Sequence, residues 1–222
     1  MDNHLYLFII WEQSRNKSEE IINDISSKFI IREIFEISWN KKNFLNNLIR
    51  FYGHSLPDPK KKTLLCGTGP FLLIIVQDRN PNFRTGIVFN GKITINDNIA
   101  KNKMKYREWV GEEFSIHGSI SAKETDHNLT LLLRKPLSEI QNNLPEMWDG
   151  AVKQFKSDLI GCNGWKSIEE FLITLNGTIN YVILRNFENF PRNLISDSHN
   201  DIDILTDGDI ILPYICMTDG SI

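Results

Sequence analysis

The sequence contains little cysteine, no long apolar run and no excess of basic residues. Three cysteines occur in 222 residues, at Cys66, Cys162 and Cys216, an odd number without the spacing of a metal site. So few cysteines, without a disulfide framework, fit a reducing compartment. We therefore expect a cytoplasmic protein.

The other two absences exclude classes of partner. No apolar run approaches the ~20 residues of a membrane-spanning helix, and the polar start does not resemble a signal peptide. The formal charge of −3 gives no basic field for general nucleic-acid binding. We interpret the lysine clusters at 60–62 and 101–105 as solvated loops, which is the usual role of charge runs. Neither a membrane nor nucleic acid is an expected partner.

Strand-like and helix-like patterns alternate along the first 135 residues. The patterns predict strands at 5–11, 30–39 and 71–77, helices at 19–29, 41–52 and 122–133, and a hairpin at 85–96 around Asn90-Gly91. This order predicts an α+β fold, a ferredoxin-like antiparallel sheet with helices on one face. Residues 101–109 are interpreted as the approach to a further strand.

The segment 106–121 concentrates the chemistry of the chain around His117. Residues 114–116 form a short strand, Gly118 interrupts it, and Ser119 or Ser121 can cap the helix that follows. His117 is then close to the start of a helix, where free backbone N–H groups and the helix dipole favour a phosphate. We expect an open imidazole beside the guanidinium of Arg107.

These residues resemble the nucleoside diphosphate kinase family over about residues 4–134. The resemblance is carried by Gly69-Pro70 before an apolar strand, by Arg107, and by Ile116-His117-Gly118-Ser119-Ile120-Ser121 before a helix. It implies a ferredoxin-like core in which His117 attacks the γ-phosphate of a nucleoside triphosphate and passes it to a diphosphate. An arginine fork would neutralise charge on the transferred group.

Further site residues are implied by the same resemblance. Tyr52 matches a tyrosine near the nucleophile, Arg107 an arginine that contacts the phosphates, and Ser119 the serine beside the histidine. The family's Lys-Pro-Asp is absent after the first strand, where the chain has Trp11-Glu12-Gln13, and its orienting glutamate falls at Asn128. Each lost charge contact costs about tenfold or more in rate, so a diverged relative is predicted.

Other roles remain open for each of these residues. A histidine at a strand end is often satisfied by nearby backbone, Arg107 can pair with Glu112 or Glu113, and Tyr52 can be a half-buried aromatic. Gly67-Thr68-Gly69-Pro70 could cradle an anion but lacks the lysine of a P-loop. His54 and His127 are interpreted as surface residues.

The last third is predicted to be a separate piece, with a kinase-like domain at 1–135, a linker at 136–164 and a small C-terminal α/β domain at 165–222. A helix at 168–175, a strand at 179–187 and Asp201-Ile202-Asp203 on a second strand resemble the start of a polymerase-β-type nucleotidyltransferase palm. Aspartates two apart on a strand share a face and can bind one Mg²⁺, or can form a solvated face. We expect the chain to be a fragment of a longer protein.

Together these features predict a nucleotide-dependent phosphoryl or nucleotidyl transferase. It would use a nucleoside triphosphate and Mg²⁺, act on a sugar or polyol phosphate, and form a homo-oligomer. The alternative is a catalytically inactive scaffold that binds a nucleotide or a protein partner.

Overall fold

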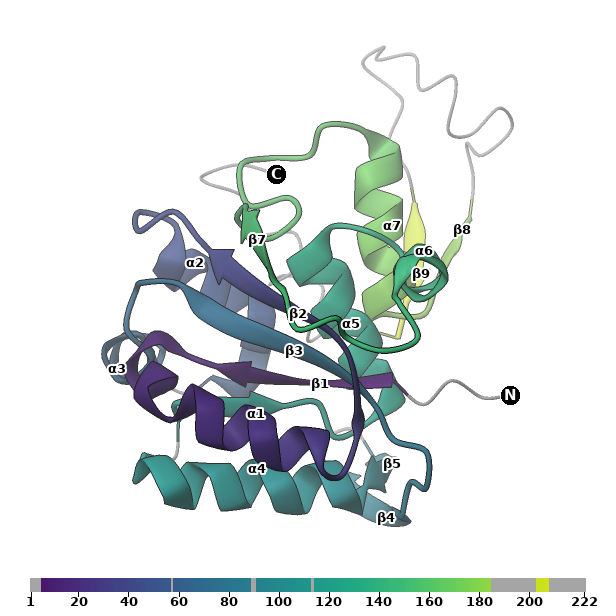
Figure 1. Ribbon diagram of the computed structural model, residues 1–222. Coiled ribbons are helices and arrows are strands. Elements are labelled where there is room, and N and C mark those ends of the chain that lie inside the picture. The colour runs from purple at the N-terminus through teal and green to yellow at the C-terminus, as the bar shows by residue number, and fades with distance from the viewer. Residues whose placement is uncertain (1–4, 57, 89–90, 113, 185–202, 208–222) are drawn as a thin grey trace.

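A five-stranded sheet forms the centre of the computed structural model, which describes residues 5–56, 58–88, 91–112, 114–184 and 203–207 (Figure 1). The strand order is β6-β1-β3-β2-β7, and neighbours pair antiparallel except β2 with β7, which are parallel. The strands are β1 (Leu5–Ile10), β2 (Ile30–Ser38), β3 (Phe71–Gln77), β6 (Ile116–Gly118) and β7 (Val152–Lys156). The first four have the order and directions of a ferredoxin-like sheet, so the predicted α+β class is confirmed.

Helices cover both faces of this sheet. The helices α1 (Ser18–Ser26) and α4 (Asp97–Val110) pack on one face, and α2 (Phe44–Tyr52), α3 (Pro59–Cys66) and α5 (Ala122–Leu133) pack on the other (Figure 1). Successive β1 side chains alternate between the two cores, with Phe8 in the first and Leu7 and Ile9 in the second. The expectation of helices on one face is therefore wrong, because β1 and β3 are apolar on both sides.

Both lysine clusters lie on helices and not on loops. Asp58 caps α3 by accepting from Lys61 N at 2.9 Å, and Pro59 occupies the first turn, where its missing N–H costs nothing. Asn96 caps α4 by accepting from Asn98 N at 3.0 Å, and Gly111 ends it in the left-handed conformation, at φ 69°. Residues 101–109 are thus helical.

The predicted hairpin is confirmed as β4 (Phe83–Val88) paired antiparallel with β5 (Gly91–Asn96). Residues 89 and 90 of its turn lie outside the described residues. Short 3-10 helices, η1 (Glu12–Lys17) and η2 (Gly53–Ser55), follow β1 and α2. No described helix has the length and apolar character needed to cross a membrane.

The segment predicted as a linker contains α6 (Leu137–Asn143) and β7, and β7 extends the sheet beside β2. Ile140, Leu159 and Ile160 from this segment are buried in the core on the α5 side. Beyond it, α7 (Ile168–Thr178) packs on α5, and β8 (Tyr181–Ile183) pairs with β9 (Ile204–Thr206). Part of the predicted linker therefore belongs to the five-stranded sheet and to the core beside it.

Candidate functional site

His117 lies on β6, the edge strand, opposite Ile9 of β1. Its exposed fraction is 4%, and the rings of Phe51 and Tyr52 meet it edge-on with centroids 5.4 Å away. The expectation of an open imidazole is therefore wrong. Both covering rings belong to the last residues of α2. The segment between β2 and β3 therefore shields the imidazole from solvent.

The two ring nitrogens of His117 have different surroundings. Nε2 lies 2.8 Å from Asn128 Nδ2 and 3.8 Å from Glu124 Oε1. Nδ1 has no hydrogen bond to a described residue. An amide nitrogen only donates, so in this arrangement Nε2 accepts and the neutral ring has its proton on Nδ1. If the amide turns to present its oxygen, the proton moves to Nε2 and Nδ1 gains the free lone pair.

The imidazole is neutral at ordinary pH. Burial lowers the pKa of His117 well below its usual value, and the nearby charges of Lys103, Lys62 and Arg107 lower it further. Asn128 occupies the position where the sequence placed the family's orienting glutamate, and the structure brings it to the ring. A neutral, positioned imidazole is the form that acts as a nucleophile.

Three cationic side chains follow the outer edge of β6, and we call them the cation row. β6 pairs with β1 through residues 115, 117 and 119, so the alternate carbonyls face away from β1. The cation row fills this edge: Lys62 donates to Phe114 O, Arg107 Nε to Ile116 O at 3.1 Å, and Lys103 Nζ to Gly118 O at 3.1 Å. Alternate residues of a strand are roughly 6.6 Å apart, so the row extends over about 13 Å.

The cation row is held at a cost in solvation. Lys62 is 5% exposed, and burial lowers its pKa to about 8. Burial also lowers the pKa of Lys103, and it raises the pKa of Glu124, whose Oε2 accepts from Ile120 N at 2.7 Å. Two buried ammonium groups, those of Lys62 and Lys103, therefore lie near a neutral ring and a carboxylate of raised pKa. An arriving anion would interact favourably with both ammonium groups.

The Tyr52 hydroxyl is a further polar group at this site. Its ring lies under the Lys62 ammonium, 4.9 Å from ring centre to Nζ, and its buried hydroxyl is approached by the Trp11 indole without a hydrogen bond of good geometry. Burial raises the pKa of this phenol well above its usual value, so the group remains a donor. Because an indole N–H only donates, the Tyr52 proton still needs an acceptor, and an oxygen-rich ligand would supply one.

Ser119 has a structural role in this geometry. Its Oγ accepts from Leu7 N at 3.0 Å and lies 2.8 Å from Thr125 Oγ1, which ties the end of β6 to β1 and α5. The hydroxyl thus both accepts and shares a hydrogen bond within the fold, and its contact with a nucleotide stays a prediction.

The predicted anion cradle at Gly67-Thr68-Gly69-Pro70 is filled by the protein itself. Gly69 N donates to Glu12 Oε2 at 2.6 Å, and the Glu12 carboxylate lies against both glycines. His127, interpreted as a surface residue, has its Nδ1 buried without a hydrogen bond, and burial lowers its pKa to about 4. The anion at these glycines is thus the protein's own Glu12, and His127 is half-buried rather than a free surface residue.

The predicted metal pair is only partly described. Asp203 precedes β9, where its carbonyl accepts from Leu184 N at 2.9 Å, and Asp201 lies outside the described residues. Within the described part of the chain, no three His, Cys, Asp or Glu side chains gather as a metal site would require. The Mg²⁺ site remains a prediction.

Fold and site together define an α+β protein of ferredoxin-like strand order with a buried, cation-lined histidine. No family model and no curated protein matches the chain. Among solved structures, it is similar to the nucleoside diphosphate kinase of Aquifex aeolicus at 11% identity and a TM-score of 0.38, over 56% of this chain and 91% of that one. A match at this level carries no conclusion about function.

Proposed function

We propose that the chain is a phosphoryl transferase that forms a phosphohistidine at His117 from a magnesium-bound nucleoside triphosphate. The observation that carries this proposal is the cation row, which α3 and α4 place along the outer edge of the strand that contains the neutral histidine. Polyphosphates are bound and their transition states stabilised by such preorganised positive groups. The sequence around His117, which resembles nucleoside diphosphate kinases, supports the same reaction.

The proposed step begins with Asn128 presenting its carbonyl oxygen to Nε2–H. Nδ1 then has a free lone pair and bonds to the γ-phosphorus as the bond from that phosphorus to the β–γ bridging oxygen breaks. The nucleoside diphosphate leaves with that electron pair, and the phosphohistidine later transfers its group to an acceptor oxygen. The cation row and the Tyr52 hydroxyl would contact the phosphate oxygens.

Entry of the substrate requires Phe51 or Tyr52 to move, because their rings cover an imidazole that is 4% exposed. Lys62 would exchange the Phe114 carbonyl for a phosphate oxygen, which is a stronger, charge-assisted partner. Reclosure would then keep water away from the phosphohistidine.

The sequence predictions of a sugar or polyol phosphate acceptor, of a nucleotidyltransferase module with Mg²⁺ at Asp201 and Asp203, and of a homo-oligomer belong to this proposal as extensions. They rest on the sequence alone.

The test is incubation with γ-labelled ATP and Mg²⁺. An acid-labile, base-stable label is expected on the protein, and it is absent from His117→Ala. His127→Ala is the control, since it removes a half-buried imidazole on the following helix and should retain the label. No label on the wild-type chain, or an equal label on His117→Ala, would contradict the proposal.

A second function is favoured by the enclosure of His117 and by the neutral Asn128 in place of a carboxylate. A scaffold that binds nucleotide without chemistry would use the same cation row. Calorimetry separates the two: saturable ATP binding by a chain that never becomes labelled indicates the scaffold.

A further inference from the structure

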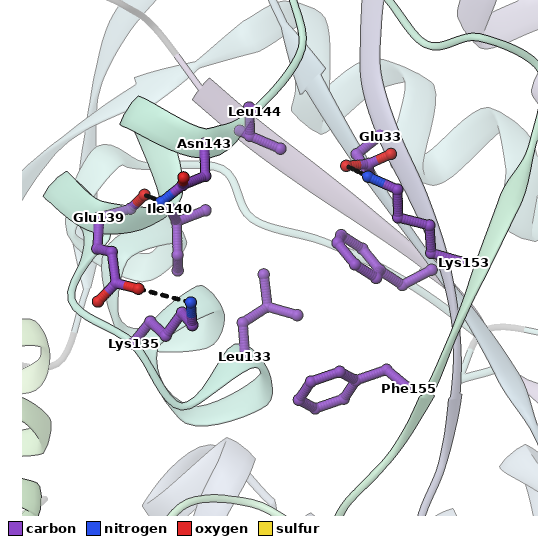
Figure 2. A pocket seen from close by; sticks show the side chains of 10 residues that line it. Glu33, Leu133, Lys135, Glu139, Ile140, Asn143, Leu144, Lys153 and Phe155 are labelled. Atoms are coloured by element: carbon purple, nitrogen blue, oxygen red, sulfur yellow. Dashed lines mark hydrogen bonds and ion pairs between the residues drawn. The ribbon is translucent and has the colours of Figure 1, made fainter.

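A pocket of about 210 Å³ lies between α6, the end of α5 and the paired strands β2 and β7 (Figure 2). Its walls are mainly apolar. The rings of Phe35 and Phe155 meet edge to face, 6.5 Å apart, and Leu133, Ile140 and Leu144 complete the lining. Such walls suit a small apolar body, and pockets of this composition are typical of small-molecule sites.

Two ion pairs border the apolar walls (Figure 2). Lys153 pairs with Glu33 at 2.6 Å, and Lys135 pairs with Glu139 at 2.5 Å. The lining thus has equal numbers of positive and negative groups. A ligand that matches it should also have zero net charge.

The two pairs differ in how easily they open. Glu33 is 4% exposed, so removing Lys153 would leave a buried carboxylate without its cation. Lys135 and Glu139 are 52% and 46% exposed, and exposed ion pairs of this kind are weak. A ligand can therefore separate Lys135 from Glu139 and bind to both, while the Lys153–Glu33 pair stays intact.

Once Lys135 and Glu139 are separated, the ligand that suits both is a zwitterion. A simple carboxylate would take Lys135 and place a second negative charge beside Glu139. A simple amine would take Glu139 and place a second positive charge beside Lys135. A molecule with adjacent ammonium and carboxylate groups gives each partner an opposite charge.

We propose that this pocket binds an apolar α-amino acid, with its side chain against Phe35 and Phe155, its carboxylate on Lys135 and its ammonium on Glu139. The proposal is independent of the phosphoryl-transfer site.

The experiment is a titration of ¹⁵N-labelled protein with L-leucine and with L-phenylalanine, monitored by amide NMR. Saturable shifts of pocket amides are expected, with a Kd of about 0.1–10 mM for a ligand of this size. 4-Methylpentanoate and 3-methylbutylamine, which each lack one charge of leucine, should bind at least about tenfold more weakly.

Variants locate the binding. Glu139→Gln should weaken leucine about tenfold. Asn143→Trp should abolish binding by filling the pocket from its exposed rim, where folding is little affected. The control is Glu20→Gln, because Glu20 forms an ion pair of similar exposure with Lys17, at 2.8 Å, away from the pocket.

Three results would overturn the proposal. They are no saturable shift with either amino acid, equal affinity for leucine and 4-methylpentanoate, and unchanged leucine affinity in both Glu139→Gln and Asn143→Trp.

Discussion

Replacing Lys62 with methionine should stabilise the fold while weakening anion binding. Methionine keeps most of the length of the side chain and removes the buried ammonium. The pKa of Lys62 falls from 10.5 to about 8 because of burial. At 1.36 kcal/mol per pKa unit, keeping this group charged at pH 7 costs about 3 kcal/mol. The Phe114 carbonyl loses a charged donor in the variant, and this loss destabilises the variant by about 1 kcal/mol.

We therefore expect the free energy of unfolding of Lys62→Met, measured with urea at pH 7, to exceed that of the wild type by about 1–3 kcal/mol. Pyrophosphate affinity, measured by calorimetry, should fall about tenfold or more, because one charge-assisted contact is lost. Lys61→Met is the matched control. Lys61 is exposed on the same helix, so its replacement should change neither quantity appreciably.

The pH dependence gives an independent check. The folded protein releases the Lys62 proton near pH 8, whereas the unfolded chain retains it until about 10.5, so raising the pH favours folding in this window. Between pH 8 and pH 9 the wild type should gain about 1 kcal/mol relative to Lys62→Met. Cys66 and the buried tyrosines have raised pKa values and oppose this trend at higher pH, so the comparison stops at pH 9. A destabilised variant with unchanged pyrophosphate affinity would refute the reasoning and make Lys62 a structural cap of the strand edge.

Two further predictions concern packing and acid stability. A Cβ at Gly177 would lie 2.3 Å from Thr130 Oγ1, so Gly177→Ala should lower the free energy of unfolding by about 1–3 kcal/mol. Asn176 is exposed on the same helix, so Asn176→Ala should not lower it. Urea unfolding of the two variants compares them. The pKa of His127 is lowered by burial to about 4, so the folded state resists protonation and stability falls as pH drops below the unfolded value of about 6.5. From pH 7 to pH 5 the wild type should lose about 2 kcal/mol more than His127→Gln, and an equal loss would contradict the assigned burial of His127.

The central strands could be predicted from the sequence because their patterns are local. β1 and β3 are continuous apolar runs, and the hairpin has a typical turn pair at Asn90-Gly91. The position of Asn128 next to His117 was implied by the sequence resemblance, in which the orienting glutamate aligns with Asn128, and the structure places Asn128 Nδ2 2.8 Å from the ring.

The cation row could not be predicted from charge runs alone. A lysine cluster usually marks a solvated surface, and only tertiary packing decides which lysine of a cluster is buried. Ile99, Lys103, Tyr106 and Val110 do fall on one helical face, so the periodicity of α4 contained a signal for Lys103 once the segment is treated as a helix. Lys62 has a similar relation to buried Cys66, one turn later on α3.

The role of β7 was hidden for a different reason. Its side chains are mostly exposed, so its sequence lacks an apolar run, and it becomes a strand by pairing with the edge of β2. Pairing of this kind depends on long-range contacts, which override local propensity.

Titration of pyrophosphate into protein labelled with ¹³C and ¹⁵N at histidine tests the central claim most directly. The ring resonances of His117 should shift saturably, with a Kd of about 0.1–1 mM, while those of His127 stay in place. Combined loss of Lys62 and Lys103 as methionines should remove the shift. If the His117 ring does not respond, or responds equally without those two lysines, the buried histidine is not an anion site.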